Sequence, residues 1–148
     1  MADLSELLKL IPVGDIAKQF GIDEDLADAA VKQIVPGLVA GLAANAEDPK
    51  GAASLANALS HDRGPVKRSV DEIDVEDGKK IVRNVYGANQ EAVASKLAVA
   101  TKESSGSDVT SDLIQKILPI VAPIVLAWLA EKFLGGGAAK EAQAAKEE

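Results

Sequence analysis

Residues 117–130 read ILPIVAPIVLAWLA, a run of 14 residues without a charged side chain. A helix needs about 20 apolar residues to cross a bilayer. This run contains two prolines and is bounded by Lys116 and Glu131. We therefore predict a buried core helix and not a membrane span. The spacing of Asp112 and Gln115 predicts a capping box at the start of this helix.

A second long helix is predicted to begin after Asp23, which is a suitable N-cap residue. The apolar residues that follow recur every three to four positions and form one broad face: Leu26, Ala30, Val31, Ile34, Val35, Leu38, Val39, Leu42 and Ala43. This face is too wide for a helix that lies on the surface, so the helix is predicted to belong to the core. Pro36 within it predicts a kink or a local break.

The two long segments resemble each other. VPGLVAGLA at residues 35–43 matches APIVLAWLA at residues 122–130, with Pro, Ala, Leu and Ala coinciding at an offset of 87 residues. A short helical segment precedes each one, at residues 16–20 and 93–97. These matches predict an internal duplication, with repeats at about residues 15–46 and 89–134. Chance similarity between sequences rich in Ala, Leu and Val is the alternative.

Turn and cap residues predict shorter helices elsewhere. Asp15 is expected to cap a helix that runs through Phe20 and ends at Gly21. Asp48-Pro49 predicts the start of a helix over residues 49–60. The buried stripe of this helix is predicted to consist of Ala52, Leu55, Ala56 and Leu59.

Residues 60–76 are polar and charged and predict a long loop. A helix is expected to restart at Asp77-Gly78 and to run to Gly87, with Ile81, Val82, Val85 and Tyr86 on one face. Asn89 is expected to cap the following helix, which would pack Val93, Leu97 and Ala100. Residues 102–110 are rich in Ser and predict another loop.

These patterns predict an all-α fold with one multihelical domain over residues 1–134. Two long central helices from an internal duplication are expected to be buried and surrounded by shorter amphipathic helices, including those at residues 49–60 and 77–87. Gly135–Gly137 are expected to end the last helix. Residues 135–148 are predicted to form a Gly-rich linker and a charged flexible tail.

Composition narrows the classes of function. The formal net charge of −7 and the aromatic content of 3% argue against binding to nucleic acid or to anionic membranes. The chain has no cysteine, which excludes disulfides, thiol catalysis and thiolate metal sites. The first six residues, MADLSE, are acidic where a secretory signal would be basic. A cytoplasmic location is therefore expected.

Three stretches resemble the YidB-like family of bacterial proteins of unknown function. They are GAASLANALSHD at residues 51–62, VEDGKKIVRNVYG at residues 75–87 and LIQKILPIVAPIVLAWLAEK at residues 113–132. The first repeat is similar as well, so the resemblance extends over about residues 15–134. It implies a multihelical fold with two buried central helices and parts that are homeodomain-like, that is, shaped like a helix-turn-helix. It implies no reaction, cofactor or catalytic residue.

Two polar clusters are candidates for chemistry. His61 and Asp62 could act as an acid–base pair, but adjacent residues rarely face a common atom, and the favoured explanation is that they finish a helix and cap the following turn. Asp71, Asp74 and Asp77 are a weak candidate for a divalent-cation site, although the ligand order of an EF-hand is absent. The alternative is that these carboxylates keep a loop solvated and favour the N-terminus of the next helix.

The prolines of the long helices offer a third candidate. They could open an apolar interaction groove, or they could simply bend the helices around the core. The groove would be lined by Pro36, Leu38, Leu42, Pro119, Pro123 and Trp128.

The function expected from these features is that of a non-enzymatic protein-interaction or assembly module, which binds a protein partner or itself, without a cofactor or a metal. A carrier of an apolar small molecule or lipid is the alternative. Nucleic-acid binding through a helix-turn-helix-like half is a second alternative. It is disfavoured because the end of the helix that would enter the groove carries Asp23, Glu24, Asp25 and Asp28.

Overall fold

The computed structural model describes residues 4–60 and 69–133, and these residues form helices and no strands, which confirms the all-α prediction. The elements in chain order are α1 (Leu4–Leu10), α2 (Val13–Phe20), α3 (Glu24–Ala46), α4 (Pro49–Ser60), the 3-10 turn η1 (Val70–Glu72), α5 (Val75–Tyr86), the 3-10 turn η2 (Gly87–Asn89), α6 (Gln90–Ser105) and α7 (Ser111–Phe133). The predicted linker and tail at residues 135–148 lie outside the described residues.

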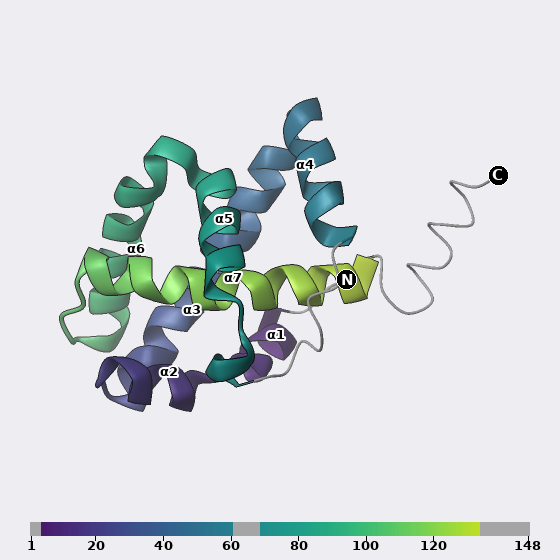
Figure 1. Ribbon diagram of the computed structural model, residues 1–148. Helices are drawn as coiled ribbons and strands as arrows, with labels where there is room; N and C mark the ends of the chain where they lie inside the picture. Colours follow the sequence, from purple (N-terminus) through teal and green to yellow (C-terminus); the bar gives the residue numbers. More distant parts are fainter. Residues whose placement is uncertain (1–3, 61–68, 134–148) are drawn as a thin grey trace.

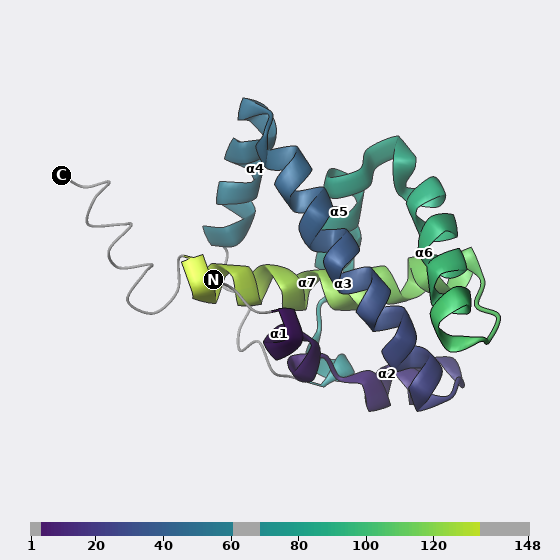
Figure 2. The same ribbon diagram turned by 180° about the vertical axis from the view of Figure 1, so that it is seen from behind.

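Helix α7 is the centre of the fold. Every residue from Ile117 to Trp128 is buried, and α7 contacts α3, α4, α5 and α6. Helix α5 crosses α7 on one side in Figure 1, and the view from behind in Figure 2 shows α3 crossing on the other side. The helix that contains the uncharged run is therefore the centre of the core, as predicted, and the other helices are arranged around it.

Helix α3 is less central than predicted. By length and composition, both α3 and α7 could cross a membrane, but core helices of soluble domains pass the same test. In α7, 72% of the most apolar stretch of the helix is buried, whereas in α3 the buried share of that stretch is 39%. Pro36 is exposed, and α3 continues through it as one helix, so the predicted kink or local break does not take the form of a break. Only part of α3 meets α7, because α1, α2, α4, α5 and α6 also pack against α3 and the remaining surface faces solvent.

The two long helices correspond in length. Each has 23 residues, and both ends of α7 (Ser111 and Phe133) follow the ends of α3 (Glu24 and Ala46) by the same 87 residues that separate the matching sequences. Pro36 and Pro123 therefore occupy equivalent positions, yet Pro36 faces solvent and Pro123 is buried. The internal duplication stays a prediction that these matching bounds support.

Several predicted caps are wrong in detail. Helix α2 begins at Val13, so Asp15 lies in its first turn, where its carboxylate accepts a hydrogen bond from the backbone N–H of Val70 at 3.3 Å. The hydroxyl of Thr110, and not a box of Asp112 and Gln115, caps α7 by accepting from the N–H of Leu113 at 3.1 Å. A cap is decided by backbone geometry as well as by residue type.

Asp23 and Asn89 do stand at the predicted N-cap positions. Neither side chain, however, makes a capping hydrogen bond.

Both predicted loops are shorter than expected. Within residues 60–76, η1 and the first turn of α5 are ordered elements, and Val70 and Ile73 are buried in the core. Helix α5 therefore begins at Val75 and not at Asp77. Helix α6 continues to Ser105, and Gly106 ends it with a φ of 76° in the left-handed region that glycine favours. The buried residues of α6 are Ala94, Ala98 and Thr101, one position beyond the predicted face.

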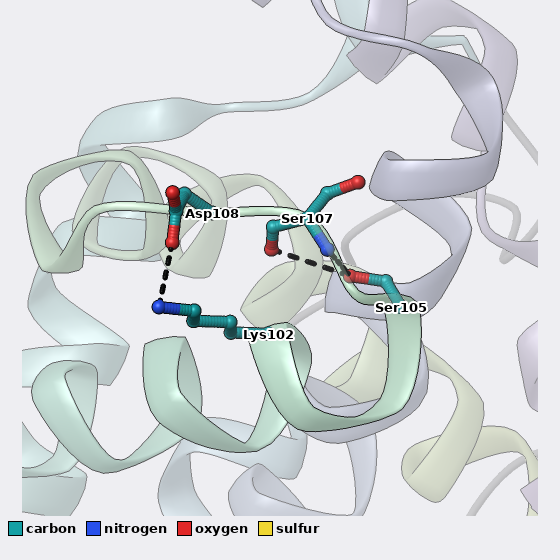
Figure 3. A network of polar contacts seen from close by, with 4 residues as sticks. All are labelled: Lys102, Ser105, Ser107 and Asp108. Carbon is teal, nitrogen blue, oxygen red and sulfur yellow. Dashed lines mark hydrogen bonds and ion pairs between the residues drawn. The ribbon is translucent and has the colours of Figure 1, made fainter.

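A small polar network closes the connection between α6 and α7 (Figure 3). Lys102 Nζ lies 2.9 Å from a carboxylate oxygen of Asp108, and the N–H of Ser107 donates to the hydroxyl of Ser105 at 3.1 Å. The Lys102 and Asp108 side chains are 63% and 86% exposed, so their ion pair adds little to stability. The network holds a surface turn and forms no site.

Helix α5 crosses α7 in close backbone contact at Gly78. A Cβ atom placed on Gly78 would overlap the backbone carbonyl of Pro119. That carbonyl cannot receive a helical hydrogen bond from residue 123, because proline has no N–H. Because Gly78 has no side chain, the α5 backbone can lie directly against the Pro119 carbonyl, which receives no helical hydrogen bond from Pro123.

Replacing Gly78 with Ala should therefore lower the free energy of unfolding by at least about 2 kcal/mol, because the new methyl group forces α5 away from α7. Urea unfolding monitored by circular dichroism measures the change. Gly14→Ala in α2 is the matched control, since its Cβ would meet the Glu24 side chain at an ordinary 3.7 Å. This control should leave stability unchanged or raise it by up to about 1 kcal/mol. Equal stability of the two variants would contradict the crossing.

Candidate docking cleft between helices α4 and α5

A cleft of about 940 Å³ opens between α4 and α5. The two helices diverge above α7 in Figure 1, and their side chains form the walls of the cleft. Its floor consists of Leu42 from α3 and of Pro123 and Leu126 from α7. The cleft therefore reaches both long helices at their C-terminal halves and is open to solvent on the other side.

The walls of the cleft are apolar near the floor. Helix α4 contributes Leu55 and Ala58, and α5 contributes Ile81 and Val85. Leu55 and Ala58 are half-buried, and none of the 12 residues of α4, all of which are described, is fully buried. Of the predicted stripe, Leu55 and Leu59 are partly buried and pack against the core, Ala52 is half-buried, and Ala56 is exposed. Helix α4 packs against α3 and α7, and the side of α4 that lines the cleft, with Leu55 and Ala58, remains partly accessible.

The rim of the cleft is acidic. Among the described residues that line it, the carboxylates are Asp48, Glu72, Asp74, Glu76 and Asp77, and the ammonium groups are Lys50 and Lys80. Local backbone contacts explain the position of two of these carboxylates. Asp74 caps α5 by accepting from the N–H of Asp77 at 3.1 Å, and Glu72 forms a capping box with Ser69. The segment before α5 is therefore acidic, and these capping hydrogen bonds hold it in a defined conformation.

The acidic cluster is not gathered around a point where a metal ion would bind. Asp74 and Asp77 line the cleft, but Asp71 does not. Within residues 4–60 and 69–133, no three His, Cys, Asp or Glu side chains are close enough to hold a metal ion together. His61 and Asp62, the candidate acid–base pair, lie outside the described residues.

Asn45 holds the base of the cleft together. Its side-chain amide donates to the carbonyl of Gly41 in α3 at 3.0 Å and to the carbonyl of Val85 in α5 at 2.8 Å. The Val85 carbonyl belongs to the last turn of α5, where helical donors run out. Asn45 therefore ties the C-terminal ends of α3 and α5 to each other. A lone amide in an Ala-rich helix end was the signal that could have identified it from the sequence.

Tyr86 packs beside this link. A Cβ atom on Gly41 would lie 2.9 Å from the Tyr86 ring, so the ring requires a residue without a side chain on α3. The Tyr86 hydroxyl is buried and has no hydrogen-bond partner in the described part of the protein. Loss of hydration raises the pKa of Tyr86 to about 12. Tyr86 thus belongs to the packing behind the cleft and not to its lining.

The structure separates the six residues of the predicted apolar groove. Leu42 and Pro123 lie together on the floor of the cleft. Leu38, Pro119 and Trp128 are buried in the core, and Pro36 is exposed on α3. Sequence reasoning missed most of the cleft, because its walls come from α4 and α5, which are not adjacent to the prolines in sequence.

The fold defines a class, an acidic multihelical domain built on one buried helix. The chain matches the model of DUF937, described as a bacterial protein of unknown function, over residues 3–132. It belongs to this family, which confirms the resemblance to YidB-like proteins. No curated protein and no solved structure matches the chain.

Replacing Asn45 with Ala should lower the free energy of unfolding by about 1–3 kcal/mol, because the Val85 carbonyl loses its side-chain donor. Thermal and urea unfolding measure the loss. Asn57→Ala is the matched control, since Asn57 is exposed on α4. Ala has the higher helix propensity, so this control should leave stability unchanged or slightly raised. If both variants behave alike, Asn45 does not bridge α3 and α5.

Tyr86 also predicts a dependence of stability on pH. Because folding raises its pKa from 10.0 to about 12, the neutral phenol stabilises the folded state fully below pH 10, and this contribution is lost as the pH rises through 12. In Tyr86→Phe this loss should be absent, and stability at neutral pH should be unchanged or higher by up to about 1 kcal/mol.

The chain has a single tyrosine, so the near-ultraviolet absorbance of tyrosinate follows this group directly. Titration at the ordinary value of 10.0 would contradict the burial of the ring.

Proposed function

We propose that this protein is a non-enzymatic interaction module of the bacterial cytoplasm that binds a protein partner in the cleft between α4 and α5. The observation that carries the proposal is the inner face of α4, where Leu55 and Ala58 remain partly accessible above an apolar floor. Burying such side chains at an interface is favourable, at about 25 cal/mol per Å² of apolar surface.

The rest of the described surface supports this choice of site. Among residues 4–60 and 69–131, Val99 on α6 is the large hydrophobic side chain that is strongly exposed, at 56%. A single exposed side chain of this kind is ordinary and needs no partner. The cleft combines the apolar side chains of Leu55, Ala58 and Val85 with polar and charged groups, as protein interfaces do.

Carriage of an apolar small molecule is a second candidate. The floor formed by Leu42, Pro123 and Leu126 favours it. Apolar ligands, however, are held in sites that cover most of their surface, and this cleft is wide and has an acidic rim. Organic extraction of the purified protein followed by mass spectrometry checks the candidate, and a co-purified apolar molecule at near-equimolar amount would support it.

A photoreactive amino acid at position 54 tests the proposed function. Ser54 is exposed on α4 and lines the cleft, and Ser95 is an equally exposed serine on α6 for the control. We expect irradiation of bacterial cells that carry the position 54 variant to yield a discrete cross-linked protein that the position 95 variant does not yield. Mass spectrometry of the adduct distinguishes a different protein from a second copy of this chain.

Adducts at neither position, or the same adducts at both, would refute a protein interaction at the cleft. An adduct with a second copy would assign the cleft to self-association, which light scattering of the purified protein then measures.

A further inference from the structure

We infer that helix α4 is a strap, which detaches as a unit from α3 and α7 while the other helices stay packed, and so uncovers the apolar floor of the cleft. The inference goes beyond the proposed function, because it concerns how the protein opens and holds with or without a partner. It rests on the weak packing of α4, on the turn that precedes α4, and on the contacts that remain without it.

Helix α4 is held less firmly than helix α5, the opposite wall of the cleft. Both helices have 12 residues, but α5 has three buried residues and α4 has none. The apolar side chains that α4 packs against the core, Leu55, Ala58 and Leu59, are only half-buried. An element with few buried apolar contacts opens at a lower free energy than the whole domain unfolds. Helix α4 therefore forms a separate opening unit.

The connection between α3 and α4 is short and compact. It consists of Glu47 and Asp48, and Glu47 has a helical backbone with a φ of −69° and a ψ of −27°. The N–H of Asp48 donates to the carbonyl of Asn45 at 3.2 Å, and a Cβ atom on Gly51 would overlap the same carbonyl. The packed position of α4 therefore requires a residue without a side chain at position 51. Changes in the backbone angles of Glu47 and Asp48 move α4 as a whole, as at a hinge.

The remaining helices keep their contacts when α4 leaves. Helix α7 also packs against α3, α5 and α6. The side-chain amide of Asn45 joins the ends of α3 and α5 by donating to the Val85 carbonyl at 2.8 Å. Since none of these contacts involves a residue of α4, its detachment leaves a packed core.

Detachment uncovers apolar side chains that the packed α4 helps to bury. Leu42 is 7% exposed and Leu126 is 1% exposed, and both line the cleft together with Leu55 and Ala58 of α4. Figures 1 and 2 both show α4 over the C-terminal half of α7, which contains Leu126. An apolar surface that is covered in the packed state therefore becomes available in the detached state.

Thiol labelling measures the detachment in the full-length protein, because the chain has no cysteine of its own. A single cysteine replaces Leu126 in one variant and Leu118 in the other. Both leucines are buried in α7, but Leu118 does not line the cleft. Urea unfolding of each variant, with the reaction rate of its unfolded chain, gives the labelling rate that global unfolding allows.

In Leu126→Cys, labelling of the folded protein should be at least about tenfold faster than global unfolding of that variant allows, because detachment of α4 exposes the thiol first. In Leu118→Cys, the labelling rate should match global unfolding. Labelling of Leu126→Cys at the rate of global unfolding would overturn the inference.

Gly51→Ala should shift the equilibrium toward the detached state, because the added methyl group overlaps the Asn45 carbonyl in the packed position of α4. Combined with Leu126→Cys, it should speed labelling by at least about fivefold, and combined with Leu118→Cys it should change the rate little. Gly14→Ala adds a methyl group to α2 where there is room, and it should speed labelling in neither variant. An equal rise in both variants, or no rise in Leu126→Cys, would overturn the inference.

Hydrogen exchange of the wild-type protein tests the strap without any substitution. A helix of 12 residues is marginal in water by itself, so a detached α4 loses its hydrogen bonds. After correction for intrinsic rates, the amides of α4 should exchange together and at least about tenfold faster than those of α5, which has the same length. Exchange of both helices at the rate of global unfolding would overturn the inference.

The failure of this inference is distinguishable from that of the proposed function. Exchange of α4 at the rate of global unfolding, together with a protein adduct at position 54 in cells, would overturn the strap and leave the protein interaction standing. Fast, concerted exchange of α4 without any adduct would support the strap and refute the protein interaction at the cleft.

Discussion

The close crossing of α5 over α7 is the contact on which the rest of the structure depends. At this point Gly78 offers no side chain, and the carbonyl of Pro119 lacks the helical donor that Pro123 cannot supply. The two backbones therefore approach more closely than side chains would allow. Since α7 is buried by its neighbours and contributes the largest share of the core, the position of α5 on α7 fixes one side of that core.

The same crossing creates the cleft. Helix α5 lies against α7 at Gly78, and its C-terminal end is tied to α3 through Asn45. Helix α4 instead leaves α3 after a short turn and packs against α3 and α7 without any fully buried residue. One wall of the cleft is thus firmly held and the other is weakly packed, so a ligand that binds between them would stabilise chiefly α4.

Much of the helical architecture could be predicted from the sequence because its signals are local. The uncharged run at residues 117–130 identified the core helix, Pro49 stands at the first position of α4, and Gly21 and Gly87 end α2 and α5 where expected. The residues of the cleft were largely missed. The grouping of the prolines into one groove relied on an assumption that α3 and α7 are equivalent, whereas Pro36 faces solvent and Pro123 is buried.

Helix periodicity, capping chemistry and hydrophobicity act within a few turns, so the sequence by itself determined that the protein is all-helical and that residues 117–130 lie in its core. Contacts between distant segments decided the rest: that η1 delivers Val70 and Ile73 to the core, that Asp15 binds a backbone N–H 55 residues away, and that α4 and α5 stand apart as the walls of a cleft. Such contacts depend on how helices pack in three dimensions, and no local pattern encodes them.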